Sequence, residues 1–276
     1  MDSAPVVRTS LVLPHPIAAV WRAWSDPAWL TGWQVERVEG ELAPGAAVRF
    51  HYDSLGLSLD LEVAERADPE RLVLRGAPPG RPPQTQSVTL TARGGATEVT
   101  VEHAGFTAGT RGADERAGTE AGWSTMLRVL GHYLDRHAGR PRACLAALAP
   151  AAASIESAWS LLGTGDGLAR WLCDGPVALA GEGAPAALTT RDGLELTGSV
   201  LAAAAPYEVA LALDRVAGVV ILRAIRIDGG GGALLIGAQA WSWRPELPAW
   251  QALGEELEPA VARLVDALGG ARGGLA

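Results

Sequence analysis

The sequence predicts an α+β protein in which one fold, a curved antiparallel sheet with short helices and a long C-terminal helix, occurs twice. Two observations carry this prediction. The same order of apolar patterns runs through both halves of the chain. A tryptophan spacing is also repeated, since Trp21 and Trp33 are twelve residues apart and so are Trp159 and Trp171. Such internal similarity indicates duplicated structural units.

In the first half, a strand through Leu11–Leu13 precedes a helical stretch from Ile17 to Trp24. Apolar residues at helical spacing from Trp123 to Leu134 predict the closing helix. Two segments are expected to be loops, the proline-rich residues 76–86 and the Gly- and Thr-rich residues 107–121. Period-two alternation predicts the strands between the helices, at residues 48–53, 57–63, 71–74, 87–91 and 98–103.

The second half repeats this order. A helical pattern from Trp250 to Leu268 closes it, with Pro259 as a candidate kink. Gly229–Gly232 is expected to be a hairpin turn. The predicted strands are residues 145–150, 187–192, 194–201, 209–213, 219–227 and 233–243, with a helix at 155–159. We therefore expect two domains, residues 1–138 and residues 139–276.

Composition limits the classes of partner. The chain has 276 residues, of which 48% are hydrophobic and 20% charged, which is typical of globular proteins. Its net charge is −8, all basic residues are Arg, and no basic block occurs, so we expect no nucleic-acid partner. Met1–Ser10 lacks the pattern of a secretion signal, and no apolar run reaches the roughly 20 residues of a membrane span. These features predict a cytoplasmic protein.

The same composition predicts hollow interiors. A helix across a strongly curved sheet leaves a gap beneath it, and this chain has only two Phe against 34 Gly and ten Trp to fill two such gaps. We therefore expect an apolar cavity in at least one half, able to hold a hydrophobic small molecule.

Candidate ligand-binding residues follow from strand faces and helix ends. His103 shares a strand face with Val99 and Val101, so its imidazole is expected to point inward, where it could orient a ligand or satisfy a backbone group. Trp33 and Trp171 end helical segments and are expected at cavity rims.

In the second half, Trp241 and Trp243 share a strand face with Gln239, where they would either plug the cavity or form a stacking wall. The full candidate set is Trp33, Phe50, Tyr52, His103, Phe106, Trp123, Met126, Leu127, Leu130, Trp171, Gln239, Trp241, Trp243 and Trp250.

No metal or cofactor site is predicted. Cys144 and Cys173 are far apart and no histidine pair has ligand spacing. His132 and His137 are five residues apart on a predicted helix and are expected to point to different sides. His51 is expected on the surface, on the strand face opposite Phe50. No nucleotide-binding or nucleophile motif occurs.

The first half resembles the SRPBCC (START/Bet v1-like, helix-grip) superfamily, and in particular the branch of the Hsp90 ATPase activator C-terminal domain. The motifs that carry the resemblance are Val20–Pro27, Leu30, Trp33, Pro69–Leu72, Val88–Leu90, Thr97–Phe106 and Gly122–Trp123. The resemblance implies two tandem helix-grip domains. Its members bind lipids, sterols, hormones or polyketides, some cyclise polyketides, some assist chaperones, and a subset protects bacteria that produce enediyne antibiotics.

The leading functional hypothesis is a non-enzymatic binder that sequesters a hydrophobic, polycyclic molecule, with enediyne self-resistance as its sharpest form. Two alternatives stay open. One is a polyketide aromatase/cyclase, in which His103 with Tyr52 or Arg49 would supply acid–base groups. The other is a chaperone-associated interaction module.

Overall fold

The computed structural model describes residues 5–78, 81–107, 109–226 and 233–269. The chain forms two compact units, Met1–Arg142 and Ala143–Ala276, which we call the first and the second unit. The predicted turn at Gly229–Gly232 lies outside the described residues. Among the described residues, no helix combines the length and the apolar character needed to cross a bilayer.

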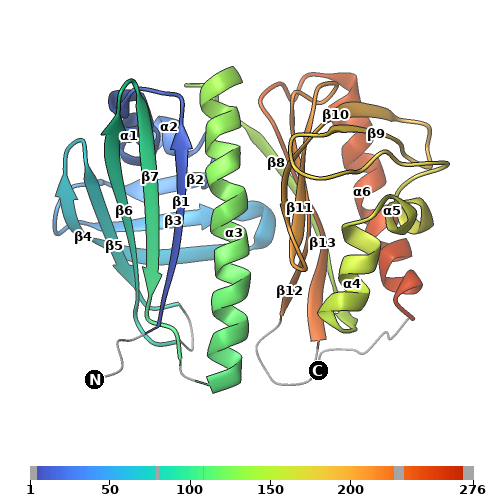
Figure 1. The fold of residues 1–276 in the computed structure, drawn as a ribbon, viewed down its shortest axis with the longest axis horizontal. Coiled ribbons are helices and arrows are strands. Elements are labelled where there is room, and N and C mark those ends of the chain that lie inside the picture. Colours follow the sequence, from blue (N-terminus) through green and yellow to red (C-terminus); the bar gives the residue numbers. More distant parts are fainter. Residues whose placement is uncertain (1–4, 79–80, 108, 227–232, 270–276) are drawn as a thin grey trace. The chain divides into compact units, whose positions relative to one another are not determined.

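The first unit is built on a seven-stranded antiparallel sheet (Figure 1). Its strands follow the order β1-β7-β6-β5-β4-β3-β2, so each hairpin lies beside the next and β1 closes the series next to β7. The strands are β1 (Val6–Leu13), β2 (Arg37–Gly40), β3 (Ala47–Tyr52), β4 (Leu57–Ala67), β5 (Arg71–Gly76), β6 (Gln84–Arg93) and β7 (Ala96–Ala104).

Three α-helices and a short 3-10 helix complete the first unit: α1 (Ile17–Ser25), α2 (Pro27–Leu30), η1 (Asp53–Leu55) and α3 (Gly109–Arg136). Asp26 starts α2, because its carboxylate accepts a hydrogen bond from the Ala28 amide at 3.0 Å and Pro27 occupies the first helical position. The long helix α3 lies against the sheet and contacts β1 (Figure 1).

The loop expected at residues 107–121 is wrong, because α3 already begins at Gly109. Glycines suggested a loop, but good helix formers, among them Ala113, Glu115 and Ala117, stand between them. Gly112 is required by packing, since a Cβ there would lie 1.7 Å from the Thr107 carbonyl oxygen. Local composition therefore gave the wrong start for the closing helix.

The second unit has a six-stranded antiparallel sheet in the order β8-β13-β12-β11-β10-β9. The helix α6 contacts β8 and β13 and continues through Pro259 (Figure 1). The strands are β8 (Ala143–Ala152), β9 (Pro185–Thr189), β10 (Glu195–Ala204), β11 (Glu208–Leu213), β12 (Gly218–Arg226) and β13 (Ala233–Ser242), and the helices are α4 (Ile155–Leu162), α5 (Gly165–Trp171) and α6 (Pro248–Ala267).

The two units share local details as well as strand order. The Trp33 indole donates to the Ala23 carbonyl at 2.9 Å, and the Trp171 indole donates to the Leu161 carbonyl at 3.0 Å. Each sheet also has an irregularity in the same hairpin, just after Val63 in β4 and just after Val200 in β10. The α+β prediction with two curved sheets, each with its own closing helix, is therefore confirmed.

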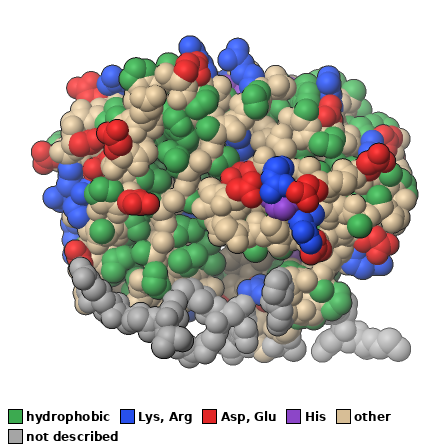
Figure 2. Space-filling view, turned by 180° about the vertical axis from the view of Figure 1, so that it is seen from behind, with side chains coloured by type: hydrophobic (Ala, Val, Ile, Leu, Met, Phe, Trp, Pro, Cys, Tyr) green, Lys and Arg blue, Asp and Glu red, His purple; other side chains and the backbone are tan. Residues whose placement is uncertain are grey.

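Two expectations about histidines are wrong. His51 is only 7% exposed, because Ser58 of β4 lies 3.0 Å and Glu39 of β2 lies 3.2 Å from its ring nitrogens. Further charged residues surround this group, and Figure 2 shows acidic, basic and histidine side chains gathered on one face. The rings of His132 and His137 are 5.3 Å apart at the C-terminal end of α3, which ends at Arg136.

Candidate functional site

The first unit contains an open pocket on the sheet face that α3 covers, which we call the inner pocket. The volume of the inner pocket is about 100 Å³. Gln86 pairs with His103, which bonds to α3, and Leu74 pairs with Gln86, so all three lie on this inner face. The lining residues are Ser58, Leu59, Asp60, Leu61, Leu74, Gly76, Ala77, Pro78, Gln84 and Gln86.

A chain of hydrogen bonds leads from the interior to this pocket. The Trp123 indole N–H donates to His103 Nδ1 at 3.3 Å, and His103 Nε2 lies 3.1 Å from Gln84 Oε1. Gln84 Nε2 in turn donates to Glu115 Oε1 at 3.1 Å, and Arg81 donates to the same carboxylate. We call these five residues the polar chain, and Gln84 is the member that also lines the pocket.

Burial keeps His103, the histidine of the polar chain, neutral. His103 is 7% exposed, and removal from water lowers its pKa to about 4. Its ring also lies 5.1 Å from that of Phe106. At neutral pH the imidazole therefore has one protonated nitrogen, and both nitrogens are occupied by Trp123 and Gln84.

Gly105 lets the backbone at Gln84 lie close to the end of β7, which carries His103. Gly105 follows β7 with a φ of 101°, and a Cβ at this position would lie 2.3 Å from the Pro83 carbonyl oxygen and 2.8 Å from the Gln84 Cα. Only glycine accepts both the backbone conformation and the close approach. The end of β7 can therefore pack directly on the start of β6.

Behind the polar chain lies a cluster of aromatic side chains. The Trp24 ring is 4.7 Å from that of Trp33 and 6.1 Å from that of Trp123. Trp33 is fully buried, so the expectation that it forms a cavity rim is wrong. Its indole bond to the α1 carbonyl makes it part of the helix packing.

The structure brings some of the candidate residues of the first unit together and leaves others in the core. His103, Phe106 and Trp123 lie next to the inner pocket without lining it. Tyr52 is half-buried, and burial raises its pKa to about 12. The remaining candidates are core or partly buried residues: Phe50, Met126, Leu127 and Leu130.

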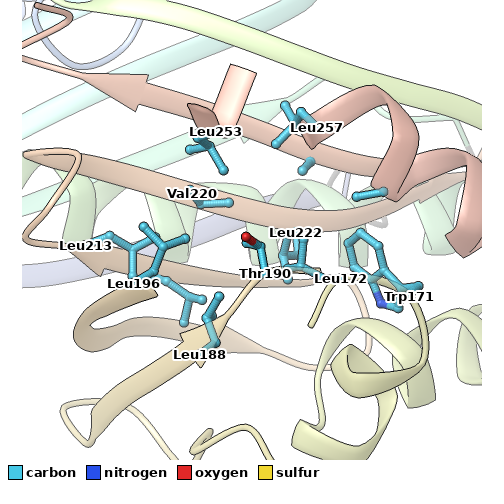
Figure 3. Close-up of a pocket in the computed structure, with 13 residues that line it drawn as sticks. Trp171, Leu172, Leu188, Thr190, Leu196, Leu213, Val220, Leu222, Leu253 and Leu257 are labelled. Carbon is cyan, nitrogen blue, oxygen red and sulfur yellow. The ribbon is translucent and has the colours of Figure 1, made fainter. Parts of the chain in front are cut away.

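In the second unit the space beneath α6 is nearly filled, and we call what remains the closed cavity (Figure 3). The volume of the closed cavity is about 10 Å³, which is roughly the room for one water molecule. Leu253 and Leu257 of α6 approach Val220 and Leu222 of β12 across it (Figure 3). The other lining residues are Trp171, Leu172, Leu188, Thr190, Leu196, Leu211, Leu213, Ala238 and Ala260.

The closed cavity offers no polar group to a ligand. Its one hydroxyl, on Thr190, donates to the Leu194 carbonyl at 3.3 Å and accepts from the Leu194 amide at 3.1 Å, and it also bonds to Asp192. These bonds hold the turn between β9 and β10. An apolar void of this size stays dry and empty.

The expected cavity role of the β13 aromatics is wrong. Ala238 lines the closed cavity, and successive side chains of a strand point to opposite faces of the sheet. Gln239 and Trp241 therefore both lie on the face away from α6. There Gln239 accepts a hydrogen bond from Arg223 at 2.5 Å. Trp243 lies beyond the end of β13, and Trp250 is a core residue of α6. Of the second-unit candidates, only Trp171 lines the cavity.

Sequence reasoning missed Gln84 and Gln86. A signal for them was present, because both alternate in phase with the buried Val88 and Leu90. Two amides in phase with a core-facing strand pattern indicate polar groups pointing inward. Among the described residues, no group of three or more His, Cys, Asp or Glu could hold a metal ion.

A comparison with protein families finds a match within the first unit. Residues 14–135 match the family model described as Activator of Hsp90 ATPase homolog 1-like protein. Among curated proteins, no match is found.

Solved structures similar to the chain include CalU16 from Micromonospora echinospora, with 19% identity, a TM-score of 0.40 and coverage of 48% of this chain and 85% of that one. DynU16, from the dynemicin biosynthetic locus, has 20% identity, a TM-score of 0.45 and coverage of 95% and 97%. The Aha1 dimer from Colwellia psychrerythraea has 17% identity, a TM-score of 0.42 and coverage of 47% and 96%.

The matched segment begins at the end of β1 and ends with α3, and so contains the inner pocket and the polar chain. The chain is thus similar to the Activator of Hsp90 ATPase homolog 1-like family over residues 14–135, which contain most of the helix-grip fold of the first unit.

Proposed function

We propose that the protein binds a small, largely apolar organic molecule in the inner pocket of the first unit and does not convert it. The observation that carries the proposal is the inner pocket itself, in which the leucines 59, 61 and 74 stand beside an amide held by the polar chain. Apolar walls with a few fixed polar groups are typical of small-molecule sites. The closed cavity of the second unit lacks both the volume and the polar group.

The volume limits what the inner pocket can enclose. A cavity of roughly 150 Å³ holds benzene, and the inner pocket offers about 100 Å³ with an open side. It therefore suits a single ring, or one edge of a larger molecule whose remainder extends beyond the pocket. The finer form of the proposal, motivated by the family resemblance, is that this larger molecule is a polycyclic antibiotic such as an enediyne.

The arrangement of His103 favours binding over acid–base catalysis. A general base needs a free lone pair within hydrogen-bond reach of the substrate. Both ring nitrogens of His103 are engaged within the polar chain, and the residue does not line the inner pocket. Its pKa of about 4 also makes it a weak base at neutral pH.

Native mass spectrometry of the protein purified from its own host tests the proposal, because a bound molecule adds a defined mass. Leu59→Trp would fill the inner pocket and should abolish that added mass. Glu62→Trp is the matched control, because Glu62 is exposed on the same strand and outside the pocket. Retention of the molecule by Leu59→Trp would show that it binds elsewhere.

The enediyne form has its own test. The protein is incubated with an activated enediyne and DNA, and intact mass and DNA cleavage are recorded. Protection of the DNA supports this form, and unprotected DNA with an unmodified chain rejects it without affecting the broader proposal.

A further inference from the structure

The polar chain has a fixed direction. An indole nitrogen can only donate a hydrogen bond, so His103 Nδ1, at 3.3 Å from the Trp123 nitrogen, must be the acceptor. The proton of the neutral imidazole is then on Nε2, which donates to Gln84 Oε1 at 3.1 Å. The Trp123 indole thus decides which histidine nitrogen carries the proton.

This direction also fixes the Gln84 amide. Its oxygen accepts from His103, and its nitrogen donates to the Glu115 carboxylate at 3.1 Å. A flipped amide would bring two donors together at His103 and two acceptors together at Glu115. Arg81 and Gln84 both bond to Glu115, so the carboxylate is held in place from two sides.

One hydrogen of the Gln84 amide is left over. A side-chain amide nitrogen carries two hydrogens, and within the described residues only one has a partner, Glu115. Gln84 lines the inner pocket. The residue therefore offers a ligand an oriented N–H donor, and an unpaired donor in a half-buried site favours ligands that can accept.

Charge narrows the ligand class further. The Glu115 carboxylate, 17% exposed, accepts a hydrogen bond from the same amide. Arg81 pairs with Glu115 and so offsets its charge. An anionic ligand at the Gln84 nitrogen would lie close to the Glu115 carboxylate, whereas a neutral carbonyl meets the donor without this repulsion.

Resting on the proposed function, we propose that Gln84 makes the inner pocket selective for neutral ligands that carry a carbonyl-type acceptor oxygen. His103, Trp123 and Glu115 act as positioning residues, because they hold the amide in the donating orientation.

Two probes of almost equal shape test this selectivity. Acetophenone carries a carbonyl oxygen where α-methylstyrene carries a CH₂ group, and benzoate is the charged analogue. Titrations followed by NMR give the affinity of each probe and, through the side-chain amide signal of Gln84, the place of contact. We expect acetophenone to bind about fivefold more tightly than α-methylstyrene and benzoate to bind more weakly than acetophenone.

Variants at two neighbouring positions separate donation from general polarity. Gln84→Met keeps the side-chain length but removes the donor, and it should equalise the affinities for acetophenone and α-methylstyrene. Gln86→Met is the matched control, because Gln86 lines the same pocket outside the polar chain, and it should preserve the preference. Thermal unfolding of both variants checks that they fold.

The outcomes separate the two proposals. Equal binding of both probes by the wild-type protein, or a preference that survives Gln84→Met, overturns the selectivity and leaves the binding function intact. Loss of the preference in Gln86→Met also overturns it, since the donor would then be Gln86. If neither neutral probe binds, or if Leu59→Trp leaves their binding unchanged, the inner pocket is not a binding site and both proposals fail.

Discussion

The two units differ most clearly along one row of cross-strand neighbours. In the first unit the row Val63, Leu74, Gln86 and His103 crosses four strands. In the second unit the row Val200, Leu211, Val220 and Ala240 crosses the corresponding strands, starting from the residue before the same irregularity. Two polar residues in one row correspond to Val and Ala in the other. The same sheet therefore supports a polar, open interior in one unit and an apolar, nearly filled one in the other.

This difference indicates which residues decide whether the space beneath the closing helix is open or filled. Strand order and the tryptophan bond between the helices are common to both units. The openness of the space beneath the closing helix depends instead on a few inward side chains. Single substitutions in the two interiors should consequently change the free energy of unfolding by clearly different amounts.

The largest effect is expected where a leucine fills the second unit. Leu211 is 1% exposed and lines the closed cavity, so Leu211→Ala should lower the free energy of unfolding by about 4 kcal/mol. Leu59→Ala in the inner pocket should cost about 1 kcal/mol, because Leu59 is half-buried beside open space. Urea unfolding measures both, and equal losses would contradict the contrast between filled and open interiors.

Exchanging the polar and apolar members of the row should have the next largest effect. Val220→Gln places an amide in the apolar cavity without a partner and should destabilise the protein by about 3 kcal/mol. Gln86→Val in the open pocket should change the stability by less than about 0.5 kcal/mol. A stable Val220→Gln variant would show that the second unit can open to water.

The smallest effect expected is on the pH dependence of stability. His103 has a pKa of about 4 in the folded protein against an ordinary value of 6.5. Between these values the unfolded chain binds a proton that the folded chain does not, so stability is lost as the pH falls through this window. Between pH 7 and pH 5 we expect a loss of about 2 kcal/mol from this residue.

Urea unfolding at a series of pH values measures this loss, with His103→Gln as the test variant. His137 also has a pKa lowered to about 4, with burial as the main cause, so His137→Gln is the matched control for the second histidine. The pH dependence should be weaker in His103→Gln than in the wild-type protein. An unchanged profile would place the His103 ring in contact with water.

The sequence predicted the fold well because apolar periodicity is a local property that is visible within a short stretch of the sequence. Alternating strands, closing helices and the repeated tryptophan spacing each reflect local patterns. The start of α3 was missed because helix formers between Gly109 and Ala121 outweighed the glycines once the segment packed. The predicted position of His132 relative to His137 was wrong as well, at the other end of the same helix.

The candidate site was harder to predict because it depends on register. Pro82 and Pro83 suggested a loop up to Gln86, yet β6 begins at Gln84, directly after them. Trp241 was expected to face the cavity, but which face of β13 lies under α6 is decided by pairing with β12, through Val220 and Ala240. A shift of one residue moves a side chain to the other face.

The hydrogen-bonded ladders have a practical consequence for protein engineering. Among the described strands, every ladder joins partners from the same half of the chain. A gene fragment that ends at Arg142 therefore encodes all the strands that frame the pocket, together with the helix that covers them. Such a fragment is a natural cassette for grafting ligand recognition onto another polypeptide.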